Sequence, residues 1–321
     1  MKEDGTAIAF HEVVKRYGAV EALAGLSLDV RSGEMFGLIG PDGAGKTTAI
    51  RLMCGLLHPD AGEIRVLGLD PRADHRPLTE RVGYLSQRFS LYGDLTIDEN
   101  IAFFAEVHGV RDYGGRRDQL LSMTQLTPFR GRLADRLSGG MKQKLALACT
   151  LVHEPALILL DEPTTGVDPV SRREFWKLLS EFLAQGITIL MSTPYLDEAE
   201  RCTRVALVHE GRALAIDEPD RLRMLIRGRM LELVGHGRED ADIVRRLPGV
   251  ADAQVFGERI HVTLGGDDAT LEERFTSALQ TTPLAGTPVR RVQPSLEDVF
   301  IAQLSAEREG SRVEGRRSVR R

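Results

Sequence analysis

Nearly continuous apolar runs occur at three places in the chain, residues 35–39, 156–160 and 187–191. A strand covered by other elements on both faces needs apolar side chains in both directions, so such runs are typical of central parallel strands. Residues 26–30 instead alternate apolar and polar positions, as a half-exposed antiparallel strand does. Residues 172–185 have the spacing of an amphipathic helix. The pattern therefore predicts an α/β domain in the first part of the chain.

Turn and cap residues predict the remaining elements of this domain. Thr96 and Glu99 have the spacing of a capping box, at the start of a helical stretch that reaches Met123 and is divided by glycines into two helices. Ser138 begins a long helix, which Pro155 ends. Further short strands are predicted at residues 7–10, 62–68 and 81–87, and a closing hairpin at residues 205–208 and 212–215.

The pattern changes after about Asp220. Residues 229–293 give the order strand, helix, strand, strand, helix, strand, which indicates a small ferredoxin-like α+β module. Residues 295–304 form a final short helix with Ser295 as its cap. The tail from Glu307 is rich in arginine and poor in apolar residues, so we expect it to be disordered. The predicted domains are residues 1–220 and 221–306, followed by a disordered tail over 307–321.

Composition narrows the possible functions. The chain has 321 residues, 42% of them hydrophobic and 28% charged, as in an ordinary globular protein with room for two domains. A net charge of −5 argues against nucleic acid as the main partner. The three cysteines lack metal-type spacing, and the first residues do not resemble a secretory signal. No apolar run reaches the ~18 residues that span a bilayer, so we expect a cytoplasmic protein that reaches a membrane only through a partner.

The glycine-rich stretch from Gly40 to Thr48 fits the phosphate-loop pattern G-x-x-x-x-G-K-[ST]. Its glycines allow successive backbone N–H groups to point into one concavity, which suits anionic oxygens. Lys46 can reach the terminal phosphates of a nucleotide, and the Thr47 hydroxyl can ligate Mg²⁺. A buried strand precedes the loop and a helix follows it, whose N-terminus adds to the anion site. A glycine-rich turn with a chance Lys-Thr pair is the alternative.

The apolar strand at residues 157–160 ends in two carboxylates, Asp161 and Glu162. Asp161 can hold Mg²⁺, directly or through water, and Glu162 can polarise an attacking water. Acidic turns after strands are common, so this pair indicates a nucleotide site only in combination with the phosphate loop.

A second candidate anion site lies at Ser138, Gly139 and Gly140, where a capping hydroxyl and two glycines leave a helix N-terminus open. One nucleotide does not need two separate glycine-lined sites in the same chain. The simplest interpretation is that the second site serves a nucleotide held by another subunit. A plain helix cap in a loop is the alternative.

Together these stretches resemble the ATPase domain of ATP-binding cassette (ABC) transporters. The sequence Ser-Gly-Gly-Met-Lys-Gln from Ser138 is similar to the family signature, and residues 165–168 are similar to its D-loop. Tyr17 falls where the family stacks an aromatic ring on adenine, and Gln87 falls at its Q-loop. The resemblance covers about residues 7 to 217.

The resemblance implies a P-loop NTPase fold with an antiparallel β subdomain and a helical subdomain. It implies ATP and Mg²⁺ as ligands, with Glu162, Lys46 and Gln87 as catalytic residues. It also implies a head-to-tail dimer, of two copies or of this chain with a related one. The implied nucleotide contacts are Tyr17, Gly40, Pro41, Asp42, Gly43, Ala44, Gly45, Lys46, Thr47, Thr48, Ser138, Gly139 and Gly140, and the implied metal ligands are Thr47, Gln87 and Asp161.

One position departs from the family pattern. The family's switch histidine is expected after the strand at residues 187–191, but Pro194 stands there. Proline can neither donate to a phosphate nor position water, whereas Glu162 is intact, so we expect slowed rather than abolished hydrolysis.

The C-terminal module and residues 294–300 resemble the extension of ATPases that serve ABC-2 type exporters, including drug and antibiotic efflux pumps. Aromatic residues between Phe89 and Phe104 would then receive a short helix of the membrane permease, although ordinary core packing explains them equally well. Three functions compete: the energising subunit of an exporter, a soluble ABC protein acting on ribosomes or DNA, and a non-catalytic nucleotide-gated scaffold. The first is favoured, because the chain has one phosphate loop and no sustained heptads.

Overall fold

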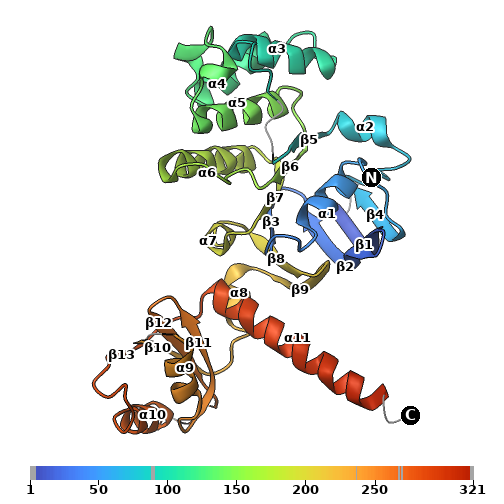
Figure 1. Cartoon of the computed structure of the whole chain (residues 1–321). Helices are drawn as coiled ribbons and strands as arrows, with labels where there is room; N and C mark the ends of the chain where they lie inside the picture. Colours follow the sequence, from blue (N-terminus) through green and yellow to red (C-terminus); the bar gives the residue numbers. More distant parts are fainter. Residues whose placement is uncertain (1–4, 88–90, 236, 267, 269, 319–321) are drawn as a thin grey trace. The chain divides into compact units, whose positions relative to one another are not determined.

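The computed structural model describes residues 5–87, 91–235, 237–266, 268 and 270–318 (Figure 1). Contacts between residues divide the chain into two compact units, with the boundary between Pro219 and Asp220. This boundary lies one residue before the predicted one.

Unit 1 is built on a six-stranded sheet with the order β5-β6-β7-β3-β8-β9. Its strands are parallel except β9, which pairs antiparallel with β8 as the predicted hairpin. Every residue of β3, β6 and β7 is buried, which explains why these segments are the apolar runs of the sequence. The strands are β3 (Met35–Ile39), β5 (Val82–Leu85), β6 (Leu157–Asp161), β7 (Thr188–Thr193), β8 (Arg204–His209) and β9 (Arg212–Asp217).

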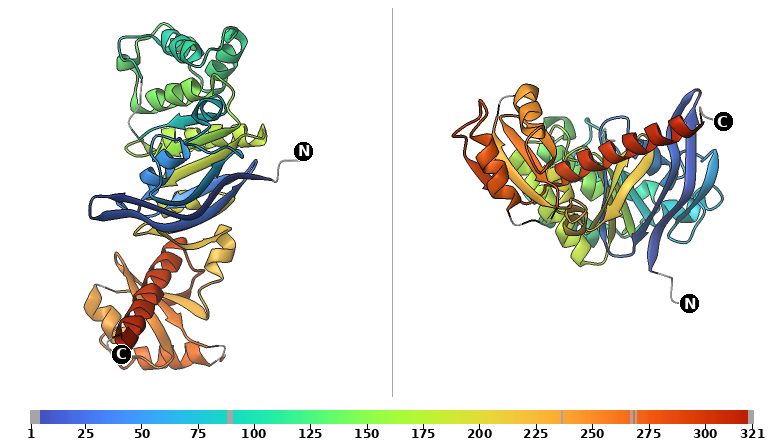
Figure 2. Two further views of the ribbon diagram at one scale, coloured as in Figure 1. Left: turned by 90° about the vertical axis from the view of Figure 1, so that its right-hand side faces the viewer. Right: turned by 90° about the horizontal axis from the view of Figure 1, so that it is seen from below.

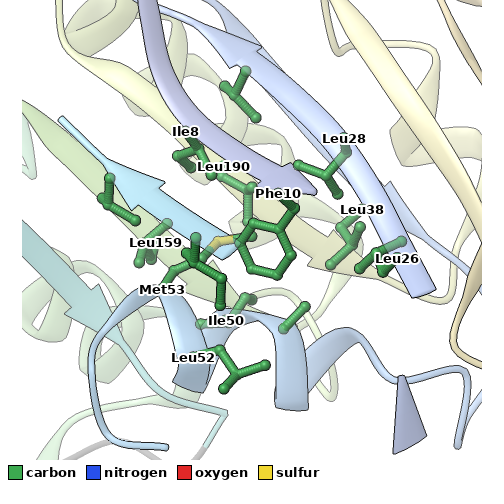
Figure 3. Packing of buried hydrophobic residues seen from close by; sticks show 14 of the residues in the cluster. Ile8, Phe10, Leu26, Leu28, Leu38, Ile50, Leu52, Met53, Leu159 and Leu190 are labelled. Atoms are coloured by element: carbon green, nitrogen blue, oxygen red, sulfur yellow. The ribbon is translucent and has the colours of Figure 1, made fainter. Parts of the chain in front are cut away.

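A three-stranded antiparallel sheet with the order β2-β1-β4 forms the β subdomain. It consists of β1 (Thr6–Tyr17), β2 (Val20–Arg31) and β4 (Ala61–Val66). Helix α1 (Lys46–Met53) packs between this sheet and the larger one, and Figure 3 shows Phe10 of β1 among Ile50 and Met53 of α1 and Leu159 of β6. This shared core fixes where the loop before α1 lies.

The helices of unit 1 include a group that forms the helical subdomain. Helices α3 and α4 pack on α5, and the three lie together at one end of the unit (Figures 1 and 2). The capping box is confirmed, since the Thr96 hydroxyl accepts from Glu99 N–H and the Glu99 carboxylate accepts from Thr96 N–H. The helices are α2 (His75–Thr79), α3 (Ile97–Val107), α4 (Gly114–Met123), α5 (Gly139–Leu151), α6 (Pro169–Ala184) and α7 (Leu196–Ala199), with 3₁₀ turns at Thr127–Phe129 and Ala134–Arg136.

The ferredoxin-like prediction for unit 2 is confirmed. Its elements follow the order βαββαβ, and all neighbouring strands of the sheet β11-β12-β10-β13 are antiparallel. Phe275 of α10 and Val244 of α9 are fully buried against the sheet. The elements are α8 (Pro219–Arg223), which begins at the boundary, β10 (Arg229–Val234), α9 (Arg238–Arg245), β11 (Val250–Phe256), β12 (Arg259–Leu264), α10 (Leu271–Leu279) and β13 (Val289–Arg291).

The final helix, α11 (Leu296–Ser318), begins as predicted, with the Ser295 hydroxyl accepting from the N–H of Asp298. It continues to Ser318, beyond Leu304, where the sequence predicts the helix to end. Few apolar residues are available for packing there, but arginine and glutamate favour helical backbone and no proline interrupts the segment. Among the described residues, no helix is both long enough and apolar enough to cross a membrane.

Candidate functional site

The loop before α1 borders a cavity of about 430 Å³ in unit 1. It is formed where the loop, the edge of the β subdomain and the carboxyl ends of the parallel strands meet. Its lining residues are Tyr17, Ala22, Asp42, Gly43, Ala44, Gly45, Lys46, Thr47, Thr48, Gln87 and Glu162. Ten of the predicted site residues are therefore brought together in one cavity, and Ala22 is an addition.

Two glycines of the loop are required by its geometry. A Cβ on Gly40 would lie 2.2 Å from the carbonyl oxygen of Val208, and a Cβ on Gly45 would lie 2.5 Å from that of Ala22. Gly45 also has a φ of 103°, which other residues rarely adopt. Gly40 and Pro41 do not line the cavity. The N–H of Gly40 is bonded to the carbonyl of Thr193, and proline has no N–H, so these two residues shape the loop rather than offer donors.

Lys46, the first residue of α1, is almost completely buried. Its ammonium group donates to the carbonyl oxygens of Gly40 at 2.8 Å and Pro41 at 3.0 Å. The same nitrogen lies 3.2 Å from Oε1 of Glu162. The ammonium group therefore has three oxygen atoms within 3.2 Å, one of which belongs to a carboxylate.

Glu162 follows directly after β6, and its carboxylate lies in the cavity wall. While Lys46 pairs with Oε1, the side-chain amide of Gln87 donates to Oε2 at 3.0 Å. The backbone of Glu162 has a φ of 49°, an unfavourable value for a residue with a side chain. Its N–H donates to Oγ of Ser192 at 3.0 Å, which ties this strained residue to β7.

Asp161, the last residue of β6, is 1% exposed. Its Oδ1 accepts from Thr47 Oγ1 at 3.0 Å and from Ser192 Oγ at 2.7 Å. Within the part of the chain that the structure describes, its buried Oδ2 has no hydrogen-bond partner. A buried carboxylate oxygen left unpartnered beside a hydroxyl fits a small divalent cation such as Mg²⁺, which prefers oxygen ligands.

The charge of Asp161 acts on its surroundings. Burial, followed by the nearby negative charge of Asp161, raises the pKa of Tyr84 to about 12. The same two causes, in the same order, raise the pKa of the Cys54 thiol. The negative charge of Asp161 therefore reaches both neighbouring groups, and a cation held by Asp161 would offset it.

A family model described as ABC transporter matches residues 23–165 of the chain. The chain is 40% identical over 301 residues to the probable multidrug ABC transporter ATP-binding protein YbhF of Escherichia coli, covering 92% of this chain and 51% of that protein. It thus spans about half the length of YbhF. It is 36% identical to the daunorubicin resistance ATP-binding protein DrrA2 of Streptomyces coeruleorubidus, over 93% of this chain and 95% of that one. The chain belongs to the ABC transporter family.

A solved dimeric structure of the ATP-binding cassette MJ0796, bound to ADP and Pi, is similar in fold to this ABC chain. The TM-score is 0.59 and the sequence identity 26%, over 66% of this chain and 98% of that one. The six-stranded sheet, the β subdomain and the helical subdomain are therefore those of an ABC cassette.

The signature residues of this ABC chain lie apart from the cavity. Ser138 is the N-cap of α5, with its hydroxyl accepting from Met141 N–H, and Gly139 is exposed like Ser138. Gly140 is buried, and a Cβ there would meet the Oγ of Ser171 at 2.2 Å. None of Ser138, Gly139 and Gly140 lines the cavity, so this chain does not bring its own signature to its own phosphate loop.

The two other family positions are also placed by the structure. Asp168, in the segment similar to the D-loop, caps α6 by accepting from the N–H groups of Val170 and Ser171, each at 3.0 Å. Pro194 follows β7 and is half-buried, but it does not line the cavity.

Sequence reasoning missed three polar residues around the site. Ser192 bridges Asp161 and Glu162, and Gln143 of α5 is buried with its amide donating to the carbonyl of Pro163. Glu198 of α7 is buried against hydroxyl groups near Glu162. One signal was available for Ser192, since it lies one residue before the end of β7, beside Asp161 of β6, and the carboxyl ends of parallel strands meet at one edge. No spacing rule points to Gln143 or Glu198.

Proposed function

We propose that this chain is the ATP-binding and ATP-hydrolysing subunit that energises an ABC-2 type exporter of drugs or other small amphipathic compounds. The observation that carries the proposal is the convergence of Lys46, Gln87 and Glu162 on one cavity, beside Thr47 and Asp161. The names of the relatives YbhF and DrrA2, which refer to multidrug transport and daunorubicin resistance, support the choice of cargo class.

In this proposal the loop and the first turn of α1 hold the phosphates of ATP. The amides at the start of a helix lack partners within the helix, and Lys46 adds a positive charge. The exposed ring of Tyr17 stacks on the adenine. Glu162 accepts a proton from the attacking water, and Gln87 orients that carboxylate through the hydrogen bond to Oε2.

Thr47, Asp161 and Gln87 would hold Mg²⁺, with the unpartnered Oδ2 of Asp161 as the observation that supports the assignment. When bound, the ion neutralises developing charge on the phosphates. The contribution of the protein is a fixed pair of oxygens, because Ser192 and Thr47 hold the Asp161 carboxylate in one orientation.

A second subunit completes the site in this proposal. Ser138 and Gly139 are exposed at a helix N-terminus and face no nucleotide of their own cavity, so they are free to contact one held by another subunit. The partner is a second copy of this chain or a related one. The dimeric, ADP-bound and Pi-bound state of the cassette MJ0796 supports this arrangement.

The membrane partner is an ABC-2 type permease, which would hold the chain at the inner face of the plasma membrane. Aromatic side chains at the start of the helical subdomain support a docking site for it. The rings of Tyr92 and Phe103 are in edge contact at 4.5 Å, Phe104 lies 5.6 Å from Phe103, and Tyr92 is 45% exposed. The predicted residue Phe89 lies outside the described residues.

Pro194 favours a second candidate, a regulatory ABC ATPase with weak hydrolysis. Steady-state ATPase rates of wild type, Glu162→Gln and Pro194→His separate the two. We expect wild type to be slow but clearly faster than Glu162→Gln, and Pro194→His to be faster than wild type. Equal rates for wild type and Glu162→Gln would exclude Glu162 as the base.

The dimer is tested separately with Glu162→Gln saturated with Mg-ATP, by light scattering at rising protein concentration. We expect a dimer, or a pair of subunits that forms when the membrane component is added. A strictly monomeric protein under both conditions would contradict the proposal. Co-purification with a polytopic membrane protein would support the exporter, whereas salt-sensitive binding to nucleic acid would support a soluble function.

A further inference from the structure

Glu198 is a buried carboxylate that the proposed chemistry does not use. It lies in the short helix α7, is 1% exposed, and does not line the cavity. Its Oε1 accepts from the hydroxyl of Thr164 at 2.6 Å, and its Oε2 accepts from the hydroxyl of Thr193 at 2.7 Å. A charge this deeply buried is costly unless it is well bonded, so the arrangement is built around it.

The Thr164 bond reaches the segment that carries Glu162. Thr164 is itself buried and comes two residues after Glu162. Within this turn the N–H of Thr165 donates to the carbonyl of Glu162, and the N–H of Val167 donates to that of Thr164. Fixing the Thr164 side chain therefore fixes the turn in which Glu162 has its unfavourable φ of 49°. Such a conformation persists only where the surroundings determine it.

The Thr193 bond reaches the end of β7. The hydroxyl of Thr193 accepts from the N–H of Tyr195 at 3.0 Å and passes its own proton to Glu198. Pro194 has no N–H, so the N–H of Tyr195 is the first backbone donor after Thr193 in the segment between β7 and α7. Ser192, the neighbour of Thr193, is the residue that accepts the N–H of Glu162. Glu198 thus joins the two segments that hold the Glu162 backbone.

The cation next to Glu198 does not replace these hydroxyl bonds. Arg172 of α6 has its Nε 3.6 Å from Oε1 of Glu198, too far for a hydrogen bond, and its guanidinium carbon lies 4.9 Å from the Tyr195 ring. Arg172 offsets the charge of Glu198, while the direction of the carboxylate is set by the two threonines.

We propose that Glu198 is a positioning residue for hydrolysis, which holds the turn after β6 so that the Glu162 carboxylate faces the attacking water. The inference rests on the proposed function, since it assigns Glu198 no role other than through Glu162. It extends the site to a residue that touches neither nucleotide nor metal.

The test is a double-mutant cycle between Glu198→Gln and Glu162→Gln, measured as single-turnover ATP hydrolysis with the full-length chain in excess over Mg-ATP. Glutamine fits the same space but carries no charge and cannot accept from both hydroxyls through both of its terminal atoms. We expect Glu198→Gln to lower the rate about tenfold or more while the protein concentration at half-saturation stays within about twofold. In the Glu162→Gln background the same substitution is expected to change the residual rate less than twofold, because the residue it positions is already gone.

The matched control is Glu34→Gln. Glu34 is likewise a buried carboxylate of unit 1, but it pairs with Arg204 and lies outside the cavity. The Glu34→Gln substitution removes the same charge as Glu198→Gln and is expected to leave the hydrolysis rate per folded molecule unchanged. Thermal unfolding of every variant gives the folded fraction. If Glu198→Gln does not fold, Thr164→Val enters the cycle in its place, since it removes the same bond.

The outcomes separate the two proposals. Equal rates for wild type and Glu162→Gln would overturn the proposed function. A slow Glu162→Gln together with a wild-type rate for Glu198→Gln would overturn only the role of Glu198. The role of Glu198 would also be overturned if Glu198→Gln lowered the residual rate of Glu162→Gln by the same factor as it lowers the wild-type rate. It would be overturned as well if Glu34→Gln lost as much activity as Glu198→Gln. Either result would describe a residue that only stabilises the fold.

Discussion

The ion pair between Lys46 and Glu162 leads to a prediction about ATP affinity. The Lys46 ammonium donates to two carbonyl oxygens and forms an ion pair with the Glu162 carboxylate at 3.2 Å. A phosphate that binds Lys46 must displace one of these acceptors. Glu162 is the acceptor that competes most strongly, because it carries a full negative charge. We therefore predict that Glu162→Gln binds ATP more tightly than wild type.

The expected size follows from the bond that is weakened. A hydrogen bond to a charged group contributes about 1.5–3 kcal/mol, and a neutral one about 1 kcal/mol. Glutamine can still accept a hydrogen bond from the Lys46 ammonium but no longer forms an ion pair with it, and we take the difference as about 1.5 kcal/mol. That corresponds to roughly a tenfold lower Kd. Removing the repulsion between the carboxylate and the phosphates acts in the same direction.

The assay is calorimetric titration of ATP in EDTA, at a protein concentration at which both variants are shown to be monomeric. These conditions exclude hydrolysis and any gain in affinity from dimer formation. Glu34→Gln, which removes a carboxylate paired with Arg204 outside the cavity, is the control and is expected to keep the wild-type Kd. An unchanged or higher Kd for Glu162→Gln would refute the idea that Lys46 must be released from Glu162.

Three further predictions concern stability. Gly45→Ala should lower the free energy of unfolding in urea by about 2 kcal/mol or more, because φ is 103° and the new Cβ meets the Ala22 carbonyl; an unchanged midpoint would contradict this. Burial lowers the pKa of His153 to about 4, so below pH ~6.5 the unfolded chain binds a proton that the folded chain does not. The free energy of unfolding should therefore fall as pH drops from about 6.5 towards 4. In thermal unfolding, His153→Phe should weaken this dependence on pH. The hydrogen bond that His261 donates to the Asp298 carboxylate raises the pKa of His261, so this pair should stabilise unit 2 below pH ~6.5 and lose its effect as pH rises through the raised pKa. His261→Gln should therefore cost more stability at pH 6 than at pH 9.

Much of the fold followed from local pattern. Runs such as residues 156–160 are apolar because the strand is covered on both faces, and that cause can be read directly from the sequence. The order of elements in unit 2 was equally clear, since each short strand alternates and glycine or proline separates it from the next. The C-terminal end of the chain was harder to predict, because over Leu296–Ser318 low hydrophobicity favours disorder whereas high helix propensity favours a helix.

The site was only partly predictable. The phosphate loop is one contiguous motif, and its glycines carry their own geometric reason. The bonds that hold the acidic residues join positions far apart in the chain, such as Thr47 and Asp161, which are 114 residues apart. Gln143 and Glu198 lie in helices and would be expected at the surface by composition, yet both are buried. Their roles depend on tertiary contacts that no spacing rule contains.

The left-handed backbone of Glu162 has a consequence for how this protein can change over time. Glycine would suit that backbone better, by about 1 kcal/mol. It would also leave the buried Lys46 ammonium without its carboxylate, which costs more than the relief of backbone strain gains. The charge of Lys46 therefore keeps a side chain at a position where the backbone alone favours glycine, and a library selected only for survival at high temperature should retain Glu162.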